Sequence, residues 1–298
     1  MSTQRAFNAD DFERQAVSPL RELGAYEALW DEPDASFKTI AAKFAKEPGA
    51  VPSDFVPEAT ARAFGTKVMQ ELAAHDVTRF GVRVHGAGEY PEKLRDAKYP
   101  VEFLYYQGWW DLVASRSVAV VGTRKPTAAG LARTHRLVRD LVADDFTVVS
   151  GLAAGVDTAV HETAIAENGR TIAVIGTPLS ATYPRENADL QRRLARDFLV
   201  ISQVPVHRYQ KQDFRRNRFF FPERNITMSA LTEATIIVEA GDTSGTLIQA
   251  RAALQQGRKL FVLDSCFRNA AVTWPQKFAA KGAIRVTDYD DIRRHLSL

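Results

Sequence analysis

The 298-residue chain contains a single cysteine, Cys266, and no long uninterrupted run of apolar residues. One cysteine cannot form an intrachain disulfide, which is typical of a protein from a reducing compartment. The N-terminal stretch MSTQRAFNADDFERQ lacks the apolar core of a signal peptide. No window approaches the ~20 apolar residues that a transmembrane helix needs. We therefore expect a cytoplasmic protein that makes no membrane contact.

Two common nucleotide-binding patterns are also missing. The dinucleotide pattern G-x-G-x-x-G is not matched, because VVGTRKPTAAG has a different glycine spacing and the second core strand ends on Ser150 rather than on an acidic residue. The P-loop pattern G-x-x-x-x-G-K-[ST] is absent as well. The net charge is only +3, which is compatible with an anionic partner but does not by itself indicate one. These absences argue against hydride transfer and against a P-loop nucleotidase.

Residues 1–77 predict a small helical N-terminal domain. The stretch DDFERQAVSPLRELGAYEALW has apolar residues at helical spacing, with a break near Ser18 and Pro19. SFKTIAAKFAKEPG begins with Ser36 as a candidate helix cap, and PEATARAFGTKVMQELAAHD begins with Pro57, which suits a first helical turn. Nothing in this part has the spacing of a catalytic site.

Residues 78–298 predict a second, larger domain in which short apolar runs alternate with helical patterns. Two strands are expected in TRFGVRVHG and VEFLYYQG. They are followed, in a core at 116–292, by strands in RSVAVVGT, FTVVSG, RTIAVIGT, FLVISQV, ATIIVEAG, KLFVLDS and AIRVTD. Apolar strands that alternate with helices are typical of parallel strands covered on both faces. The expected fold class is α/β: an extended Rossmann-like, doubly wound, mostly parallel sheet.

The loops after these strands contain glycine, serine or threonine just before a helix. They are GTRKPTAAG, SGLAAGVDTAVH, GTPLSATYPRENADL and EAGDTSGTLIQA. Ligands of such sheets bind outside the carboxyl ends of the strands, and backbone N–H groups at helix N-termini favour anions. Gly122 allows a tight turn, and Arg124 and Lys125 add positive charge. The sequence therefore predicts a wide anion-binding surface at this edge.

The stretch DFRRNRFFFPERN, residues 213–225, combines four arginines with three consecutive phenylalanines. Taken alone it has two interpretations. It is either a buried apolar run flanked by solvated arginines, or a nucleic-acid site in which arginines meet phosphates and rings stack on bases.

Asp157 and His161 are four residues apart on one expected helix, so their side chains can face each other. Because no further ligand or nucleophile is arranged nearby, we expect an Asp–His hydrogen bond that fixes the loop rather than a metal or acid–base site. Cys266, near the end of an apolar strand, is expected in the core.

The ordered motifs of the chain resemble those of the DprA/Smf family of DNA-processing proteins, over about residues 88 to 292. The motifs are VAVVGTR, VVSGLAAGVDTAVHETAIAENGRTIAVIGT, YPRENADL, FFPERN, VEAGDTSGTLIQARAALQQGRKLFVL and KGAIRVTD. The resemblance implies a homodimer that binds single-stranded DNA and loads a RecA-type recombinase onto incoming DNA during natural transformation. It also implies a binding protein rather than an enzyme, with no catalytic residue, cofactor or metal.

The resemblance also assigns the site, motif by motif. Arg124 of VGTR and Arg224 of FPERN would face phosphates, and the loops after the strands would offer main-chain N–H groups. The expected DNA-binding residues are Arg124, Lys125, Ser150, Gly151, Arg215, Arg216, Arg218, Arg224, Asn225, Ser244, Gly245 and Thr246. Structural support is expected from Gly122, Asp157, His161 and Glu239, while Phe220 and Phe221 would anchor their loop in the core.

The chain departs from the family pattern at several positions. Ala154 stands where the family has a basic residue, Ile226 follows the Arg–Asn pair, and Gln203 replaces a glutamate. LDSCF stands where a Pro-Gly pair often ends the last core strand, and no winged helix precedes the end at Leu298. The loss of a basic residue at Ala154 bears most directly on DNA binding.

These departures keep two alternatives open. One is a Rossmann-type nucleotide-binding sensor or a phosphoribohydrolase-like protein; the other is an interaction protein in a defence or signalling system. The hydrolases have a GGxGTxxE motif, and DTSGTLIQ places Gln249 where their glutamate stands. An amide cannot exchange a proton at neutral pH as a carboxylate does. The sequence therefore favours DNA binding, with nucleotide binding as the alternative.

Overall fold

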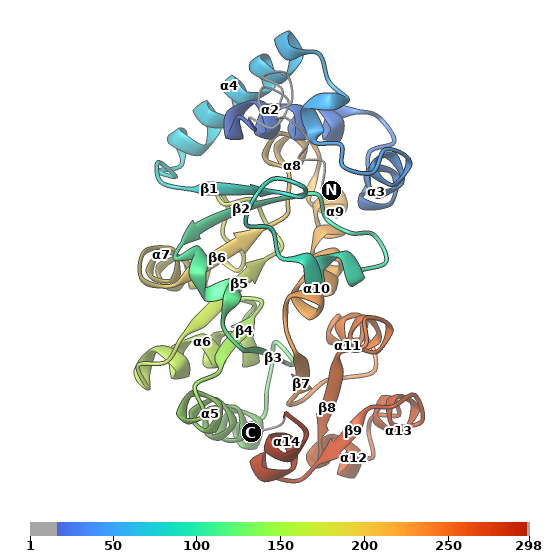
Figure 1. The fold of residues 1–298 in the computed structure, drawn as a ribbon. Helices are drawn as coiled ribbons and strands as arrows, with labels where there is room; N and C mark the ends of the chain where they lie inside the picture. Colours follow the sequence, from blue (N-terminus) through green and yellow to red (C-terminus); the bar gives the residue numbers. More distant parts are fainter. Residues whose placement is uncertain (1–16, 297–298) are drawn as a thin grey trace, which may run out of the picture.

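The N-terminal part of the computed structural model, which describes residues 17–296, is helical. Its helices are α2 (Pro19–Asp31), α3 (Phe37–Lys46) and α4 (Glu58–Ala74), and they lie at one end of the molecule (Figure 1). The Ser36 cap is confirmed, because its hydroxyl accepts from Thr39 N. Helix α2 begins at Pro19, next to the expected break, and Pro57 directly precedes α4 rather than lying in its first turn. The part of the first expected helix that precedes residue 17 lies outside the described residues.

Nine strands form one sheet in the order β1-β2-β6-β5-β4-β3-β7-β8-β9. The strands are β1 (Gly81–Val84), β2 (Phe103–Gly108), β3 (Ser117–Val121), β4 (Thr147–Ser150), β5 (Thr171–Ile175), β6 (Leu199–Ser202), β7 (Ala234–Ile237), β8 (Lys259–Leu263) and β9 (Ile284–Val286). The β1–β2 and β2–β6 pairs are antiparallel, and the other pairs are parallel. The predicted mostly parallel, doubly wound sheet is confirmed.

Helices connect the strands along the chain (Figure 1). They are α5 (Ala128–Ala143), α6 (Val156–Ala166), α7 (Ala188–Asp197), α8 (Val206–Lys211), α9 (Phe214–Asn217), α10 (Phe220–Leu231), α11 (Thr246–Gln255), α12 (Asp264–Arg268), α13 (Trp274–Ala279) and α14 (Tyr289–His295). Short 3-10 helices occur at Pro52–Asp54, Glu92–Asp96, Trp110–Ala114 and Arg185–Asn187. Within residues 17–296, no helix combines the length and the apolarity needed to cross a membrane.

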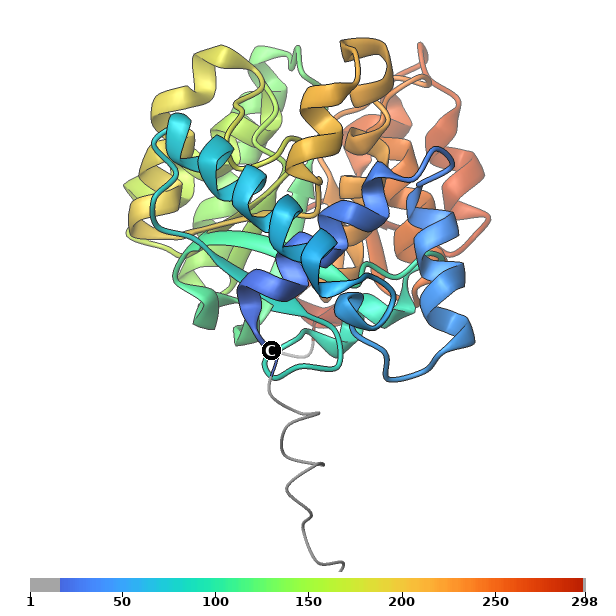
Figure 2. The same cartoon turned by 90° about the horizontal axis from the view of Figure 1, so that it is seen from above.

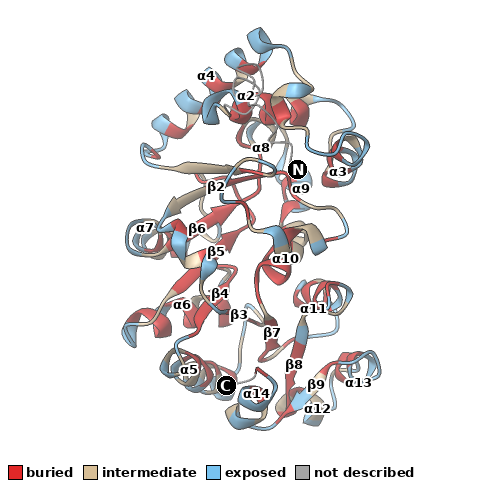
Figure 3. Ribbon diagram, in the orientation of Figure 1, coloured by how far each residue is buried: buried red, intermediate tan, exposed pale blue. Residues whose placement is uncertain are grey.

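The core lies on both faces of the sheet, as alternation along β3 shows. Val118 and Val120 belong to the cluster that contains side chains of α5, α6 and α14, whereas Ala119 and Val121 belong to the cluster that contains those of α10 and α11. Successive strand residues point to opposite faces, so a strand between two helical layers is apolar throughout. Figure 3 shows the result: buried strands between helices that are exposed on their outer sides. Seen from above, the blue N-terminal helices lie in front of the rest of the fold (Figure 2).

Cys266 is buried, as expected, although it lies in α12 just after β8 rather than in the strand itself. Burial raises the pKa of its thiol to about 12, so the thiolate form is disfavoured.

The helical N-terminal part packs directly on the sheet. The Tyr26 ring stacks on Phe103 of β2 with a centroid distance of 4.9 Å, and both belong to the cluster that continues under α10. The domain boundary expected near residue 77 stays a prediction, while the hydrophobic core runs across it.

The strand order reverses direction at one point of the sheet, between β3 and β7. The chain moves from β3 to β4 on one side and returns to pair β7 on the other side of β3. The connections after β3 and β7 therefore diverge to opposite faces, and a crevice opens between them at their carboxyl ends.

A buried carboxylate joins α2 to β2 and to the start of α8. Glu27 is fully buried; its Oε1 accepts hydrogen bonds from Tyr105 Oη and, at 2.7 Å, from Val206 N. Its Oε2 accepts from His207 N at 2.9 Å. Burial nevertheless raises the pKa of Glu27 to about 7, because desolvation outweighs these hydrogen bonds.

Replacing Glu27 by glutamine should remove a pH dependence of stability. The pKa of Glu27 rises from 4.5 to about 7 on folding, so the folded state binds more protons in this range. Its stabilising contribution is therefore fully present below pH 4.5 and is lost as the pH rises through about 7, by up to about 3 kcal/mol. Urea unfolding of both proteins at about pH 5 and about pH 8 measures this difference. A stability difference between them that does not change with pH would contradict the prediction.

Candidate nucleic-acid interface

A cleft of about 510 Å³ lies at the carboxyl ends of β3 and β7, where the two connections diverge. Its lining comes from the loop after β3, the loop before α6, the side of α10 and the start of α11. We call it the switch-point cleft. This is where ligands bind in doubly wound sheets, and the sequence predicted an anion site at this edge.

Two exposed cations lie at the cleft. Arg124 and Lys125 are both exposed and both line it, as the sequence predicted. The Lys125 N–H donates to the Thr123 hydroxyl at 3.2 Å, which holds the turn after β3. The Arg124 guanidinium also lies 5.8 Å from the centre of the Tyr183 ring. Their positive charges are therefore available to an anion in the cleft.

The start of α11 forms the opposite side of the cleft, with fewer free donors than expected. Ser244 N–H donates to Gly241 O at 3.1 Å, and Thr246 N–H donates to the Ser244 hydroxyl at 3.2 Å. Thr246 itself is buried, and its hydroxyl donates to Gly122 O at 3.3 Å. The N–H group of Gly245, which lies between those of Ser244 and Thr246, lacks an acceptor within the part of the chain that the structure describes. Asn225 Nδ2 donates to Gly245 O at 3.1 Å and fixes this turn.

A second hollow, of about 400 Å³, adjoins the cleft and shares Arg124, Arg224, Asn225 and Gly245 with it. The remaining lining residues are Tyr183, Phe214, Arg218, Phe219, Phe221 and Pro222. We call it the aromatic groove.

The rings of the aromatic groove are unusually exposed for such large apolar side chains. Tyr183 is 37% exposed, Phe214 62% and Phe219 64%. The centre of the Tyr183 ring lies 6.3 Å from that of Phe214 and 5.3 Å from that of Phe221. Arg218 lies over Phe219, 5.5 Å from its centre. Exposed rings beside guanidinium groups offer stacking faces for flat partners.

The stretch DFRRNRFFFPERN has both buried and exposed residues. The stretch forms α9 and the start of α10 rather than the expected loop. Phe220 is buried, as expected, and Phe221 is half-buried against Tyr183, whereas Phe219 is exposed. Arg215, Arg216 and Arg218 are exposed, but only Arg218 lines the groove.

Arg224, which was expected to project to the site and face phosphates, lines both the cleft and the groove but is only 4% exposed. Its Nη1 donates to the carbonyl oxygens of Gly151 and Val174, and its Nε donates to Asn225 Oδ1 at 2.9 Å. Burial lowers its pKa to about 10, against the attraction of Asp157, so the group remains a cation at neutral pH. Arg224 thus forms the floor where the cleft and the groove meet and positions the loops around it.

Ser150 and Gly151 also differ from the prediction, because both are buried beneath the cleft. The Ser150 hydroxyl donates to Val120 O at 2.8 Å, and the Gly151 carbonyl oxygen accepts from Arg224 Nη1. A Cβ atom on Gly151 would lie 2.5 Å from Arg224 Nη1. This glycine is therefore required for the close approach of the arginine, not for contact with a ligand.

The expected Asp157–His161 hydrogen bond is absent. His161 Nδ1 pairs instead with the Thr171 hydroxyl at 2.7 Å, and burial lowers the pKa of the imidazole to about 3, so it is neutral. Asp157 accepts from Ala153 N at 3.4 Å and is attracted by Arg224. Burial raises the pKa of Asp157 in spite of these contacts. Asp157 supports the loop after β4, as expected, but its electrostatic partner is Arg224.

Glu239 supports the site from the end of β7. Its carboxylate accepts from the Thr127 hydroxyl at 2.9 Å and from Thr127 N at 3.3 Å, at the start of α5. The protein's own carboxylate thus occupies this helix N-terminus, where a dinucleotide phosphate binds in other doubly wound folds. Gly122 allows the loop after β3 to approach the start of α6 closely, since a Cβ on this glycine would lie 2.6 Å from Val156 Cγ2.

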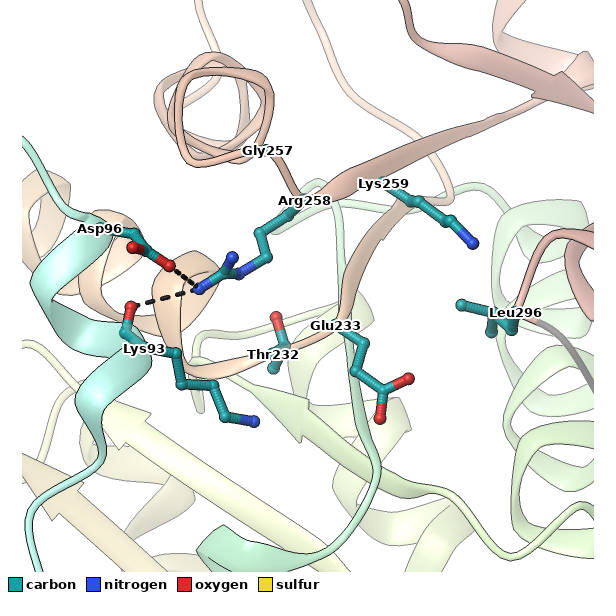
Figure 4. Close-up of a pocket in the computed structure, with 8 residues that line it drawn as sticks. All are labelled: Lys93, Asp96, Thr232, Glu233, Gly257, Arg258, Lys259 and Leu296. Atoms are coloured by element: carbon teal, nitrogen blue, oxygen red, sulfur yellow. Dashed lines mark hydrogen bonds and ion pairs between the residues drawn. The ribbon is translucent and has the colours of Figure 1, made fainter.

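A third hollow, of about 350 Å³, lies at the opposite edge of the sheet, where β7 and β8 begin (Figure 4). Its chemistry differs from that of the cleft and the groove. Arg258 pairs with Asp96 at 2.6 Å, Glu233 pairs with Arg116 at 2.9 Å, and Lys259 Nζ donates to His295 O. None of its eight lining residues is aromatic. Most of its charges are already paired, and it has no stacking face. Within residues 17–296 no group of three or more His, Cys, Asp or Glu side chains is placed to hold a metal ion.

The motif-based assignment missed the rings. Tyr183, Phe214 and Phe219 line the groove, but none was among the expected DNA-binding residues. The available signal was local: Phe214 and Phe219 alternate with arginines in DFRRNRFFFPERN, and Tyr183 lies in YPRENADL, a loop after a core strand.

Residues 81–297 match the family described as DNA recombination-mediator protein A. The chain belongs to this family. It is 31% identical to DNA processing protein DprA of Bacillus subtilis over 234 residues, which cover 78% of this chain and 77% of that protein.

Two solved structures of family members are similar as well. The X-ray structure of DprA from Streptococcus pneumoniae has a TM-score of 0.65 at 25% identity and covers 97% of this chain and 98% of that one. A DprA structure from Helicobacter pylori, described as showing a single-stranded DNA binding mode, has a TM-score of 0.62 at 28% identity and covers 73% of this chain and 95% of that one.

Gly151→Ala should destabilise the fold, because the added methyl group would clash with Arg224 Nη1 and lie 2.7 Å from Asp157 Oδ2. The expected loss is about 1–3 kcal/mol, typical of overpacking at a site that cannot relax. Gly241→Ala is the matched control, since a Cβ on this exposed glycine meets nothing within 4 Å. Denaturant unfolding of the two variants measures the difference. Equal stability of the two would show that Arg224 does not require the glycine.

Proposed function

We propose that the protein binds single-stranded DNA along the switch-point cleft and the aromatic groove. The observation that carries the proposal is the junction of the two. A cationic cleft with Arg124 and Lys125 adjoins a groove lined by exposed rings. Arg124 lines the cleft and the groove alike. Proteins that bind single strands combine these same parts, a positive path for the backbone and rings for the bases.

The two parts are suited to different portions of a nucleotide. Phosphates fit the cleft, where Arg124, Lys125 and the Gly245 N–H converge. Bases fit the groove, because a base must leave a duplex before both of its faces can stack between rings such as Tyr183 and Phe214. Stacking faces are common to all four bases, so the site should bind single strands with little sequence preference.

The biological role we propose is DNA processing in recombination and natural transformation. The family's description as a recombination mediator supports a RecA-type recombinase as the recipient of the bound strand. We further propose a homodimer that acts in the cytoplasm as a binding protein rather than as an enzyme. The DprA structure described with a single-stranded DNA binding mode supports the DNA ligand.

Nucleotide hydrolysis has little support in the cleft. Gln249 is fully buried, and its Nε2 donates to the Thr235 hydroxyl at 3.3 Å. An amide at this position has no proton to exchange with a glycosidic bond at neutral pH. With glutamine where the hydrolases have their glutamate, the cleft is suited to binding rather than to turnover by that route.

Arg124→Ala combined with Lys125→Ala should weaken binding to oligo-dT and lower its salt dependence. Each phosphate contact to a single strand adds about 0.7 to the slope of log affinity against log salt. Losing both contacts should therefore lower the slope by roughly 1.4. Fluorescence anisotropy at several salt concentrations measures affinity and slope together, with duplex DNA of the same length expected to bind more weakly.

The charge-matched control is Arg136→Ala with Arg139→Ala, since both are exposed on α5 and line neither the cleft nor the groove. This variant should keep most of the wild-type slope. Equal slopes for the wild type and the Arg124/Lys125 variant would refute the assignment of phosphates to the cleft.

Ala154→Lys should strengthen binding to single strands. Ala154 is exposed beside Ala153, which lines the cleft, so a lysine there adds a cation without burying it. The expected gain is about fivefold at low salt, equivalent to about 1 kcal/mol for one charge-assisted contact, and it should shrink as salt screens it. Oligo-dT affinity at two salt concentrations tests this, after thermal stability has been checked. No gain at low salt in a folded variant would exclude a DNA path over this loop.

A further inference from the structure

The aromatic groove takes Phe214, Arg218 and Phe219 from one short segment. This segment, residues 206–219, contains α8 and α9, and we call it the α8–α9 segment. The hydrogen bonds found for residues 212–219 within the described chain all end between residues 208 and 221. The part that carries the rings is therefore not hydrogen-bonded to the sheet. Apart from the contact of the Phe214 ring with Tyr183, its position depends on how its two ends are held.

The first end is held by α2 through polar contacts. Glu27 accepts hydrogen bonds from Val206 N and His207 N, the first two N–H groups of α8. One helical turn further along α2, Asp31 pairs with Lys211 Nζ at 2.6 Å, at the end of α8. The carboxylates of α2 thus contact both ends of α8.

The second end is held by aromatic packing. Phe220, directly after the segment, is buried, and its ring centre lies 6.0 Å from that of Trp30 on α2 and 6.1 Å from that of Phe37 on α3. The Trp30 and Phe37 rings are themselves 4.8 Å apart in an edge-to-face arrangement. Such pairs have preferred angles as well as distances, so they fix the direction in which α10 begins.

We infer that helices α2 and α3 position the base-stacking side of the DNA site by holding both ends of the α8–α9 segment. Glu27 and Phe37 are then positioning residues, since neither lines the cleft or the groove. The inference rests on the proposed function and assigns a role to the helical N-terminal part. It also separates two contributions to binding: the cleft cations hold phosphates, and the N-terminal helices determine how well bases stack.

The test uses Glu27→Gln in the full-length protein with two ligands, oligo-dT and an abasic oligonucleotide of equal length. Glutamine keeps the size of the side chain, but its amide places N–H groups where a carboxylate oxygen accepts, so the start of α8 loses a contact. We expect a loss of about fivefold or more in affinity for oligo-dT, in the range that one stacked base contributes. We expect no loss for the abasic strand, which has nothing to stack, and no change in the salt slope.

Glu22→Gln is the matched control. Glu22 lies on the same helix and is equally buried, but its carboxylate accepts from Ser53 N and the Ser53 hydroxyl, both at 2.8 Å, rather than from α8. Its replacement removes a buried carboxylate of α2 and should leave oligo-dT affinity within about twofold of wild type, since no groove residue depends on it.

A second pair covers the case in which Glu27→Gln does not fold. Phe37→Leu removes the ring that contacts Phe220, whereas Phe44→Leu removes a ring of the same helix that packs on Phe55 at 4.9 Å. Only Phe37→Leu should lower oligo-dT affinity, and again only for strands that carry bases.

The outcomes separate the two proposals. If the wild type fails to bind oligo-dT, the proposed function is wrong. If the wild type binds, but folded Glu27→Gln or Phe37→Leu binds oligo-dT as tightly as its control, the positioning role is wrong and the function stands. An equal loss for oligo-dT and abasic strands would also overturn the inference, because it would indicate damage to the phosphate path instead.

Discussion

The buried guanidinium of Arg224 is the contact on which the geometry of the site depends. Its Nη1 bridges the carbonyl oxygens of Gly151 and Val174, at the carboxyl ends of the neighbouring strands β4 and β5. Removing a charge from water is costly unless charge and hydrogen bonds compensate for it. Here the compensation comes from two carbonyls, Asn225 and the nearby carboxylate of Asp157. The start of α6, the start of α10 and two strand ends are thereby held around one cation.

This constraint explains why the two halves of the interface meet. Asn225, which accepts from Arg224 Nε, also donates to Gly245 O and so positions the start of α11. On the other side, α10 begins at the buried Phe220. The exposed Arg218 and Phe219 directly precede it in the chain and line the groove. A cation that is almost fully buried thus joins the ends of β4 and β5 to α10 and, through Asn225, to the start of α11. Phosphate attraction is long-ranged and screened by salt, while stacking needs contact and is insensitive to salt.

Much of the fold followed from the sequence because the strands are continuous apolar runs between helical patterns, as in VAVVGT and TIAVIGT. The exposed Arg124 and Lys125 were also placed correctly at the edge of the sheet. The orientation of Arg224 was not predictable in this way, because a motif gives the position of an arginine but not its partners. The pairing of His161 with Thr171, rather than with Asp157, depends on how α6 packs on β5. The contact of Glu27 with α8 spans about 180 residues of sequence and has no local signature.

The most direct measurement is photo-crosslinking of a single strand that carries 5-iododeoxyuridine, followed by peptide mapping. Iodouracil reacts with rings that stack on it, so it reports the base-binding side of the site. Adducts should concentrate at Tyr183, Phe214 and Phe219, the exposed rings of the aromatic groove. Efficient crosslinking that avoids these three residues, for example to the hollow at the opposite edge of the sheet, would contradict the account.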